Sequence, residues 1–158
     1  MSNVMRWRYG DTNPVMLVVD AETVIEIGDL VFLDTDDVKP ASATGYGASL
    51  AATQETFHDK FVGVAMQASR AGETTDVRVA TSGVFEFEQA AASAEVGTRI
   101  GVDDNGGGDA LLNQQVIAVA VGSPQLAIGR CARRATSATS LLVALYSTVM
   151  NDGPQAVS

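Results

Sequence analysis

The segment 61–88 constrains the fold of this chain more than any other part of the sequence. Val62 and Val64 alternate with aromatic or small residues, and Phe85 and Phe87 alternate with glutamates. A period of two with β-branched and aromatic residues predicts β-strands, with the phenylalanines facing a core and the glutamates facing water. A glycine lies in each gap between the apolar runs, where the chain must reverse. The segment predicts three short strands in an antiparallel meander.

Composition narrows the class of protein. The chain has 158 residues, of which 46% are apolar, and this predicts one domain with a substantial core. Its formal net charge of −9 argues against sequence-independent binding to nucleic acid and against docking on an anionic membrane. No run approaches the roughly 18 apolar residues of a membrane span, and the start does not resemble a signal peptide. The single cysteine, Cys131, excludes an internal disulfide and is interpreted as a small buried side chain.

Strand patterns continue on both sides of the central segment. The apolar run at 15–19 predicts a buried strand, the run at 24–34 predicts two strand pieces bent at Gly28, and the run at 116–121 predicts a strand buried on both faces. Ser49 predicts the N-cap of one short helix that extends to Phe57 or Lys60. The small residues at 89–94 favour a linker.

These patterns predict a mainly β fold: a compact antiparallel β-barrel or sandwich with one short helix and an extended N-terminal arm. The predicted organisation is an arm at 1–14, a single β domain at 15–150 and a flexible tail at 151–158.

Two halves of the chain echo each other, which predicts an internal duplication relating 24–79 to 95–145. Each half contains a turn, a strand, an intervening segment and a hairpin. The two halves together predict a pseudo-symmetric closed sheet that leaves few exposed edges. The matching positions are Glu26–Gly28 with Glu95–Gly97, Gly63 with Gly129, Val77 with Val143, and Val79 with Leu145.

The N-terminal arm is the first candidate interaction site. Alternation predicts that Met5, Trp7 and Tyr9 share one side of an extended segment that also carries Arg6 and Arg8. One interpretation is an edge strand folded back on its own domain. The other is an arm that lies on a neighbouring subunit and anchors there through aromatic side chains.

An arginine cluster is the second candidate. Arg130, Arg133 and Arg134 place three of the ten basic residues within five positions of an otherwise acidic chain. The cluster is interpreted either as a solvated loop and strand end or as a patch that meets an acidic surface on a sister subunit or a larger partner.

Catalytic and metal signatures are weak. Two sets of acidic residues are candidate ligands of a divalent ion: Asp34, Asp36 and Asp37, and Asp103, Asp104 and Asp109. Neither set has the spacing of a calcium loop. His58 has no nucleophile or carboxylate in a recognisable motif, so a solvent-facing helical residue is expected. The sequence predicts no enzyme, no cofactor and no metal site.

Several motifs together resemble the small head-decoration or capsid cement proteins of tailed bacteriophages. The resemblance runs over about 24–145 and includes the helix that leads into Phe61. It rests on a pattern of glycines and β-branched residues, in the motifs FVGVA, AGETTDVRV, GVFEFE, EVGTRIGVD and AIGRCARRATS.

The resemblance implies a structural virion protein made in the host cytoplasm and placed on the outer surface of the capsid. Such proteins are compact β folds, often homotrimers, that brace contacts between major capsid subunits, and their terminal arms reach to neighbouring subunits. The family has no catalytic residues to carry over. Two alternatives stay open: a tail or baseplate structural module, and a trimeric β-barrel ligand-binding or enzyme domain whose acidic loops bind a divalent ion.

Overall fold

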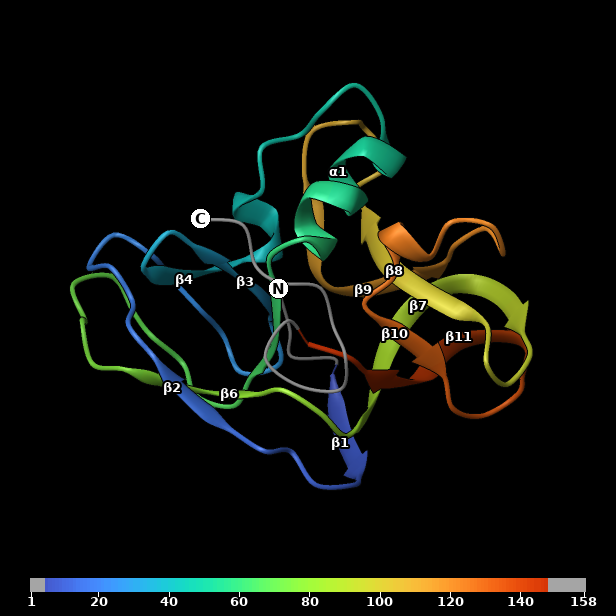
Figure 1. Cartoon of the computed structure of the whole chain (residues 1–158), viewed down its shortest axis with the longest axis horizontal. Coiled ribbons are helices and arrows are strands. Elements are labelled where there is room, and N and C mark those ends of the chain that lie inside the picture. The colour runs from blue at the N-terminus through green and yellow to red at the C-terminus, as the bar shows by residue number, and fades with distance from the viewer. Residues whose placement is uncertain (1–4, 148–158) are drawn as a thin grey trace.

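The computed structural model describes residues 5–147, which form two β-sheets around a shared core (Figure 1). One sheet has the order β1-β7-β11-β10-β8-β9, and an additional β7–β9 pairing closes five of its strands into a barrel. The other sheet has the order β2-β6-β5-β3-β4. The strands are β1 (Arg6–Tyr9), β2 (Val15–Leu17), β3 (Leu30–Asp34), β4 (Asp37–Pro40), β5 (Phe61–Ala65), β6 (Val77–Ala80), β7 (Val84–Ala94), β8 (Arg99–Asp104), β9 (Leu111–Ala118), β10 (Gly129–Cys131) and β11 (Ala135–Leu145).

The predicted mainly β barrel-or-sandwich class with one short helix is confirmed. The α-helix of the described part is α1 (Leu50–His58), and two 3-10 turns, η1 (Ala41–Ala43) and η2 (Pro124–Leu126), complete the elements. The predicted tail at 151–158 lies outside the described residues.

Alternation within β7 and β11 builds the barrel core. Phe85 and Phe87 are fully buried with their ring centroids 6.3 Å apart, and Leu141 and Val143 of β11 lie in the same hydrophobic cluster. Each buried aromatic or branched side chain contributes about 1.5–3 kcal/mol to folding. The opposite faces of the same strands point outward, and this leaves Glu86 of β7 at the surface, half-buried.

The second sheet covers two cores, one on each face. Val31, Val62 and Val79 point into a small cluster of its own, whereas Leu30 and Val64 on the same strands face the core shared with the barrel. The sheet curls back on itself, because the Val38 N–H of β4 donates to the Val18 carbonyl just after β2 at 2.9 Å. This backbone bond thus joins β4 to the segment that follows β2.

Helix α1 forms as its sequence predicts. The Ser49 hydroxyl accepts a hydrogen bond from the Ala52 N–H and caps the first turn. Phe57 packs edge-on against Phe32 of the second sheet, at 5.8 Å between centroids. Gln54 is buried and donates to the Val102 carbonyl of the barrel at 2.8 Å, so the helix contacts both sheets.

Equivalent backbone hydrogen bonds recur in the two sheets at 2.8 Å. In the second sheet they run from Gly28 to Ala65, from Ala65 to Asp29 and from Met66 to Arg78, and in the barrel from Gly97 to Cys131, from Cys131 to Thr98 and from Ala132 to Leu142. Strand pairing matches Ala65–Val79 with Cys131–Val143, so the counterpart of Val79 is Val143 and the predicted match to Leu145 is wrong by two residues. The internal duplication itself stays a prediction.

Five sequence predictions of local structure are wrong. In the run at 24–34, the piece before Gly28 is not a strand, because Ile25 forms an isolated bridge to Ser69 and β3 begins at Leu30. Strands β6 and β7 do not pair, because the chain crosses between the sheets at 81–83, so the meander stops at β6. The expected linker at 89–94 continues β7, since its backbone pairs with β11 as far as Ala94–Ala135. The expected buried strand at 15–19 is the edge strand β2, and Met16 and the following Val18 are half exposed. The strand expected at 116–121 is not buried throughout, because β9 ends at Ala118 and Val121 is 89% exposed.

Candidate functional site

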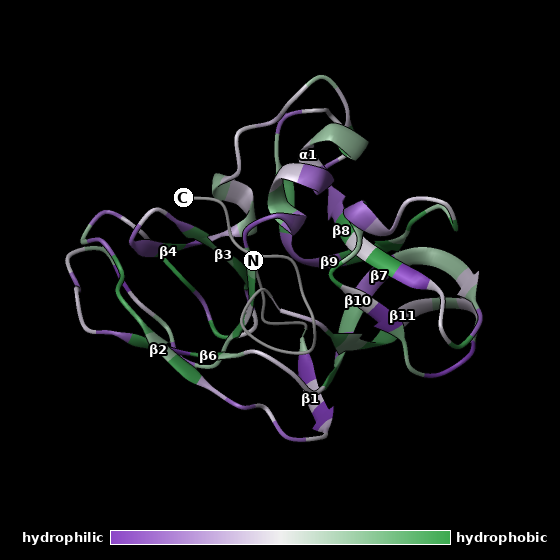
Figure 2. Cartoon of the chain, in the orientation of Figure 1, coloured by the Kyte–Doolittle hydropathy of each residue, from purple (hydrophilic) through white to green (hydrophobic). Residues whose placement is uncertain are grey.

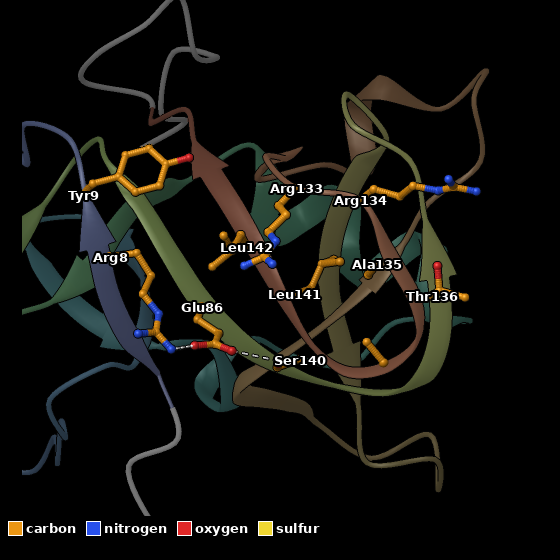
Figure 3. Close-up of a pocket in the computed structure, with 11 residues that line it drawn as sticks. Arg8, Tyr9, Glu86, Arg133, Arg134, Ala135, Thr136, Ser140, Leu141 and Leu142 are labelled. Carbon is orange, nitrogen blue, oxygen red and sulfur yellow. Dashed lines mark hydrogen bonds and ion pairs between the residues drawn. The ribbon is translucent and has the colours of Figure 1, made fainter.

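A hollow of about 570 Å³ lies on the outer face of β1, β7 and β11. We call it the basic groove. Figure 3 shows Arg8 and Tyr9 of β1 on one side, Arg133 and Arg134 on the other, and Leu142 of β11 between them. The remaining lining residues are Glu86, Leu141, Ala135, Thr136, Ala138 and Ser140.

The rim from β1 is held by an ion pair. Arg8 donates to Glu86 Oε1 on the neighbouring strand β7, and the Ser140 hydroxyl of β11 donates to Glu86 Oε2 at 2.8 Å. The hydrogen bond from Arg8 is the largest cause that lowers the pKa of Glu86 below its ordinary value, and the hydrogen bond from Ser140 is the next. Glu86 is therefore ionised at neutral pH and orients Arg8 across the groove.

The opposite rim comes from the turn between β10 and β11. Arg134 Nε lies 3.0 Å from Glu95 Oε1, and both side chains are largely exposed, so this pair contributes little to stability. Arg133 is exposed and makes no ion pair within residues 5–147. Of the three arginines in the groove, Arg133 is thus the one that pairs with no carboxylate among the described residues.

A buried amide fixes β1 beside the barrel. Gln114 of β9 is 1% exposed and accepts from the Met5 N–H at 3.1 Å, while its Nε2 donates to Asp29 Oδ1 at 3.0 Å and to the Ile27 carbonyl at 3.1 Å. Burial raises the pKa of Asp29, and the hydrogen bond from Gln114 acts in the opposite direction. The start of β1, the barrel and the second sheet therefore meet at one side chain.

The structure places the residues of the predicted arm in different environments. Strand β1 pairs antiparallel with β7 of its own chain, with Arg6 opposite Glu86 and Trp7 opposite Phe85. Met5 is 7% exposed and belongs to the core, whereas Trp7 and Tyr9 are 51% and 53% exposed. A β-bulge between Trp7 and Tyr9 breaks the expected alternation, so Tyr9 lines the groove together with Arg8 instead of sharing a side with Met5.

The predicted arginines separate as well. Arg133 and Arg134 line the groove, but Arg130 donates to the Gly97 carbonyl at 3.3 Å and is not among its lining residues, and Arg6 donates to the Met5 carbonyl at 2.8 Å. Sequence reasoning missed Glu86, Ser140 and Leu142. The outward glutamate of the alternating β7 pattern was a usable signal for the first of these, but nothing local marks the other two.

In each acidic loop, at least one carboxylate is bound within the protein. Lys39 Nζ lies 2.6 Å from Asp34 Oδ2, and the Tyr46 hydroxyl donates to Asp104 Oδ2 at 2.6 Å, which raises the pKa of Tyr46 to about 12. Among residues 5–147, no three His, Cys, Asp or Glu side chains are grouped so as to hold a metal ion. His58 is half-buried with its Nδ1 beside the Ala127 carbonyl, so the prediction that it faces solvent is wrong.

Comparison with known proteins gives a structural likeness. No family model and no curated protein matches the chain. A solved structure, the head fiber gp8.5 N base in bacteriophage phi29, is similar at a TM-score of 0.47 and 12% sequence identity, over 84% of this chain and 93% of that chain. Within the described residues, no helix is both long and apolar enough to cross a membrane.

Proposed function

We propose that this chain is a structural virion protein of a tailed bacteriophage, a decoration protein on the outer surface of the head that stabilises contacts between major capsid subunits. The sequence resemblance to capsid cement proteins supports the class. The observation that carries the proposal is the basic groove, where the N-terminal strand and the arginine turn, about 125 positions apart in the sequence, form one concave surface.

The mechanism is the addition of buried interface at junctions of the shell. Trp7 and Tyr9 expose half of their surface beside Arg8, and aromatic and arginine side chains dominate the binding energy of protein interfaces. A contact of about 1,600 Å² is enough for a stable complex, and a homotrimer binding several shell subunits at once gains avidity. No step of this function is catalytic.

Co-sedimentation with empty shells of the cognate capsid protein tests the proposal. Deletion of the whole arm is a poor variant, because it also removes the buried Met5 and the pairing of β1 with β7. The double substitution Trp7→Ala with Tyr9→Ala keeps the backbone and is expected to weaken shell binding at least about tenfold. Val121→Ala is the matched control, since Val121 is 89% exposed and lies outside the groove.

Two results contradict the proposal. Absence of shell binding by the wild-type chain rejects the decoration role, and unchanged binding by the double variant rejects the role of β1. Binding to purified tails in place of shells would assign the chain to a tail or baseplate module.

A further inference from the structure

The negative charge of the chain is concentrated at the end of the molecule away from the groove. Residues 15–80, which contain the whole second sheet, include eleven Asp and Glu but four Lys and Arg. Figure 2 shows hydrophilic stretches in the loops at the left end of this sheet. Its exposed acids, which we call the acidic end, are Asp20, Glu22, Asp36, Glu73 and Asp76.

Backbone contacts hold the loops of the acidic end together. The Gly72 N–H donates to the Ala21 carbonyl at 2.7 Å, which joins the loop after β2 to the loop before β6. The bond from Val38 to Val18 brings the β3–β4 turn beside the same loop. The acidic end is therefore a defined surface formed by three neighbouring loops.

Asp36 is the exposed charge that the β3–β4 turn contributes to this surface. In the β3–β4 turn, Asp34 is bound by Lys39 and Asp37 is 5% exposed, but Asp36 is exposed at the tip between them. Within residues 5–147, Asp36 makes no ion pair. It complements Arg133, a groove cation that makes no ion pair with any carboxylate in the described part of the chain.

We propose that the basic groove of one copy receives the acidic end of a second copy, with the β3–β4 turn between the two rims and Asp36 facing Arg133. The inference rests on the proposed function, because it names the contact that would build the homotrimer. Tyr9 and Leu142 supply aromatic and apolar surface next to the charges.

A second copy is favoured as the occupant because the complementary charge is present on the same chain. The groove lies over the barrel strands, and the acidic end lies beyond β2 and β4 on the other sheet (Figure 1), so the two surfaces belong to opposite parts of the molecule. A contact between different patches is heterologous, and it closes into a ring when the rotation between copies permits. Three copies related in this way would leave no groove unoccupied.

Sedimentation velocity of the full chain tests the inference through a charge swap. Arg133→Glu is expected to weaken self-association at least about tenfold at low salt, because it sets like charges against each other. Arg130→Glu has the same net charge and lies three residues away outside the groove, so it is expected to associate like the wild type. Adding Asp36→Lys to Arg133→Glu is expected to restore association, and 0.5 M salt is expected to weaken the wild-type assembly.

The outcomes separate the inference from the proposed function. Self-association by Arg133→Glu equal to the wild type, or a wild type that stays monomeric at all concentrations, overturns the inference. Loss of association that the swap does not restore overturns the pairing with Asp36. If Arg133→Glu lowers shell binding but leaves self-association intact, the groove belongs to the shell contact, and the inference fails while the proposed function stands.

Discussion

The barrel and the second sheet share a backbone pattern but complete it differently. In both, a glycine turn leads into a strand that pairs with the first arm of a hairpin, and the same three hydrogen bonds recur. In the barrel, the long strands β7 and β11 and the β7–β9 pairing close the structure, whereas the second sheet closes through the single bond from Val38 to Val18. The shared hairpins also carry different side chains. The β10–β11 hairpin supplies Arg133 and Arg134 to the groove, whereas the loop of the β5–β6 hairpin carries Glu73 and Asp76 of the acidic end.

The two hairpin glycines give the strongest test of this equivalence. A Cβ at Gly63 would overlap the Ala80 carbonyl oxygen, and one at Gly129 would overlap the Ala144 carbonyl oxygen. Gly63→Ala and Gly129→Ala are each expected to lower the free energy of unfolding by about 3 kcal/mol or more, because the clash is with backbone. Urea denaturation measures the effect. Gly122→Ala, where a Cβ meets nothing within 4 Å, is the control, and a mild effect at either hairpin glycine would break the comparison.

The junction between the two regions gives the next largest effect. Gln114→Leu removes the partner of the Met5 N–H and of the Asp29 carboxylate in a buried position. We expect a loss of about 2–3 kcal/mol in the free energy of unfolding, since buried polar groups are left unsatisfied. Gln125→Leu, at an exposed site in η2, is the control. Equal denaturation midpoints for the two variants would show that Gln114 does not join the regions.

The two turn glycines distinguish the regions more finely. Gly28 and Gly97 both have positive φ, +99° and +89°, so alanine costs about 1 kcal/mol at each. A Cβ at Gly28 would also lie 3.0 Å from Gln114 Oε1 and from Met5 Cβ, whereas at Gly97 it meets nothing within 4 Å. Gly28→Ala is therefore expected to lower the thermal midpoint more than Gly97→Ala does, and the reverse order would contradict the structure at this junction.

The smallest effect concerns Asp37 of β4, the residue before Val38, whose N–H closes the second sheet. Burial is the largest cause that raises the pKa of Asp37 above its ordinary value of 3.8, and contact with the Asp20 carboxyl is the next. Because the folded-state pKa is the higher one, the contribution of Asp37 to stability is present below pH 3.8 and is lost as the pH rises through the raised value.

Asp37→Asn removes this titration and is expected to stabilise the protein by about 1 kcal/mol at pH 7, where the buried Asp37 Oδ2 otherwise has no donor. The gain should disappear near pH 3 in urea titrations. Asp36→Asn, on the exposed neighbour, is the control and is expected to leave the free energy of unfolding at pH 7 unchanged. A gain of the same size at both pH values would count against the assigned cause.

The sequence predicts where strands and the helix lie better than it predicts which strands pair with one another. The period of two located β5, β6 and β7, and Ser49 located the start of α1, because these signals are local. The crossing between sheets after β6 was missed, since alternation at Val77 and Phe85 is the same whichever strand lies alongside. The alanines of 89–94 looked like a linker because small residues show no periodicity, and only pairing with β11 makes them a strand.

For the same reason, the sequence predicts the residues of the groove better than it predicts that they lie together. Arg133 and Arg134 stand out as a cluster in an acidic chain, and Arg8 and Tyr9 belong to the arm that the sequence marks as a candidate site. Their proximity depends on strand β7, which pairs with β1 on one side and β11 on the other, and on the bulge that turns Tyr9 toward the groove. Pairing between distant segments and a one-residue shift of register leave no mark in the local pattern.

The stability of empty shells tests the central claim most directly. The temperature at which shells of the cognate capsid protein disrupt should be measured with and without saturating amounts of this chain. A decoration protein that adds interface between capsid subunits is expected to raise that temperature by several degrees and to saturate at a fixed number of copies per shell. An unchanged disruption temperature under saturating protein would contradict the account.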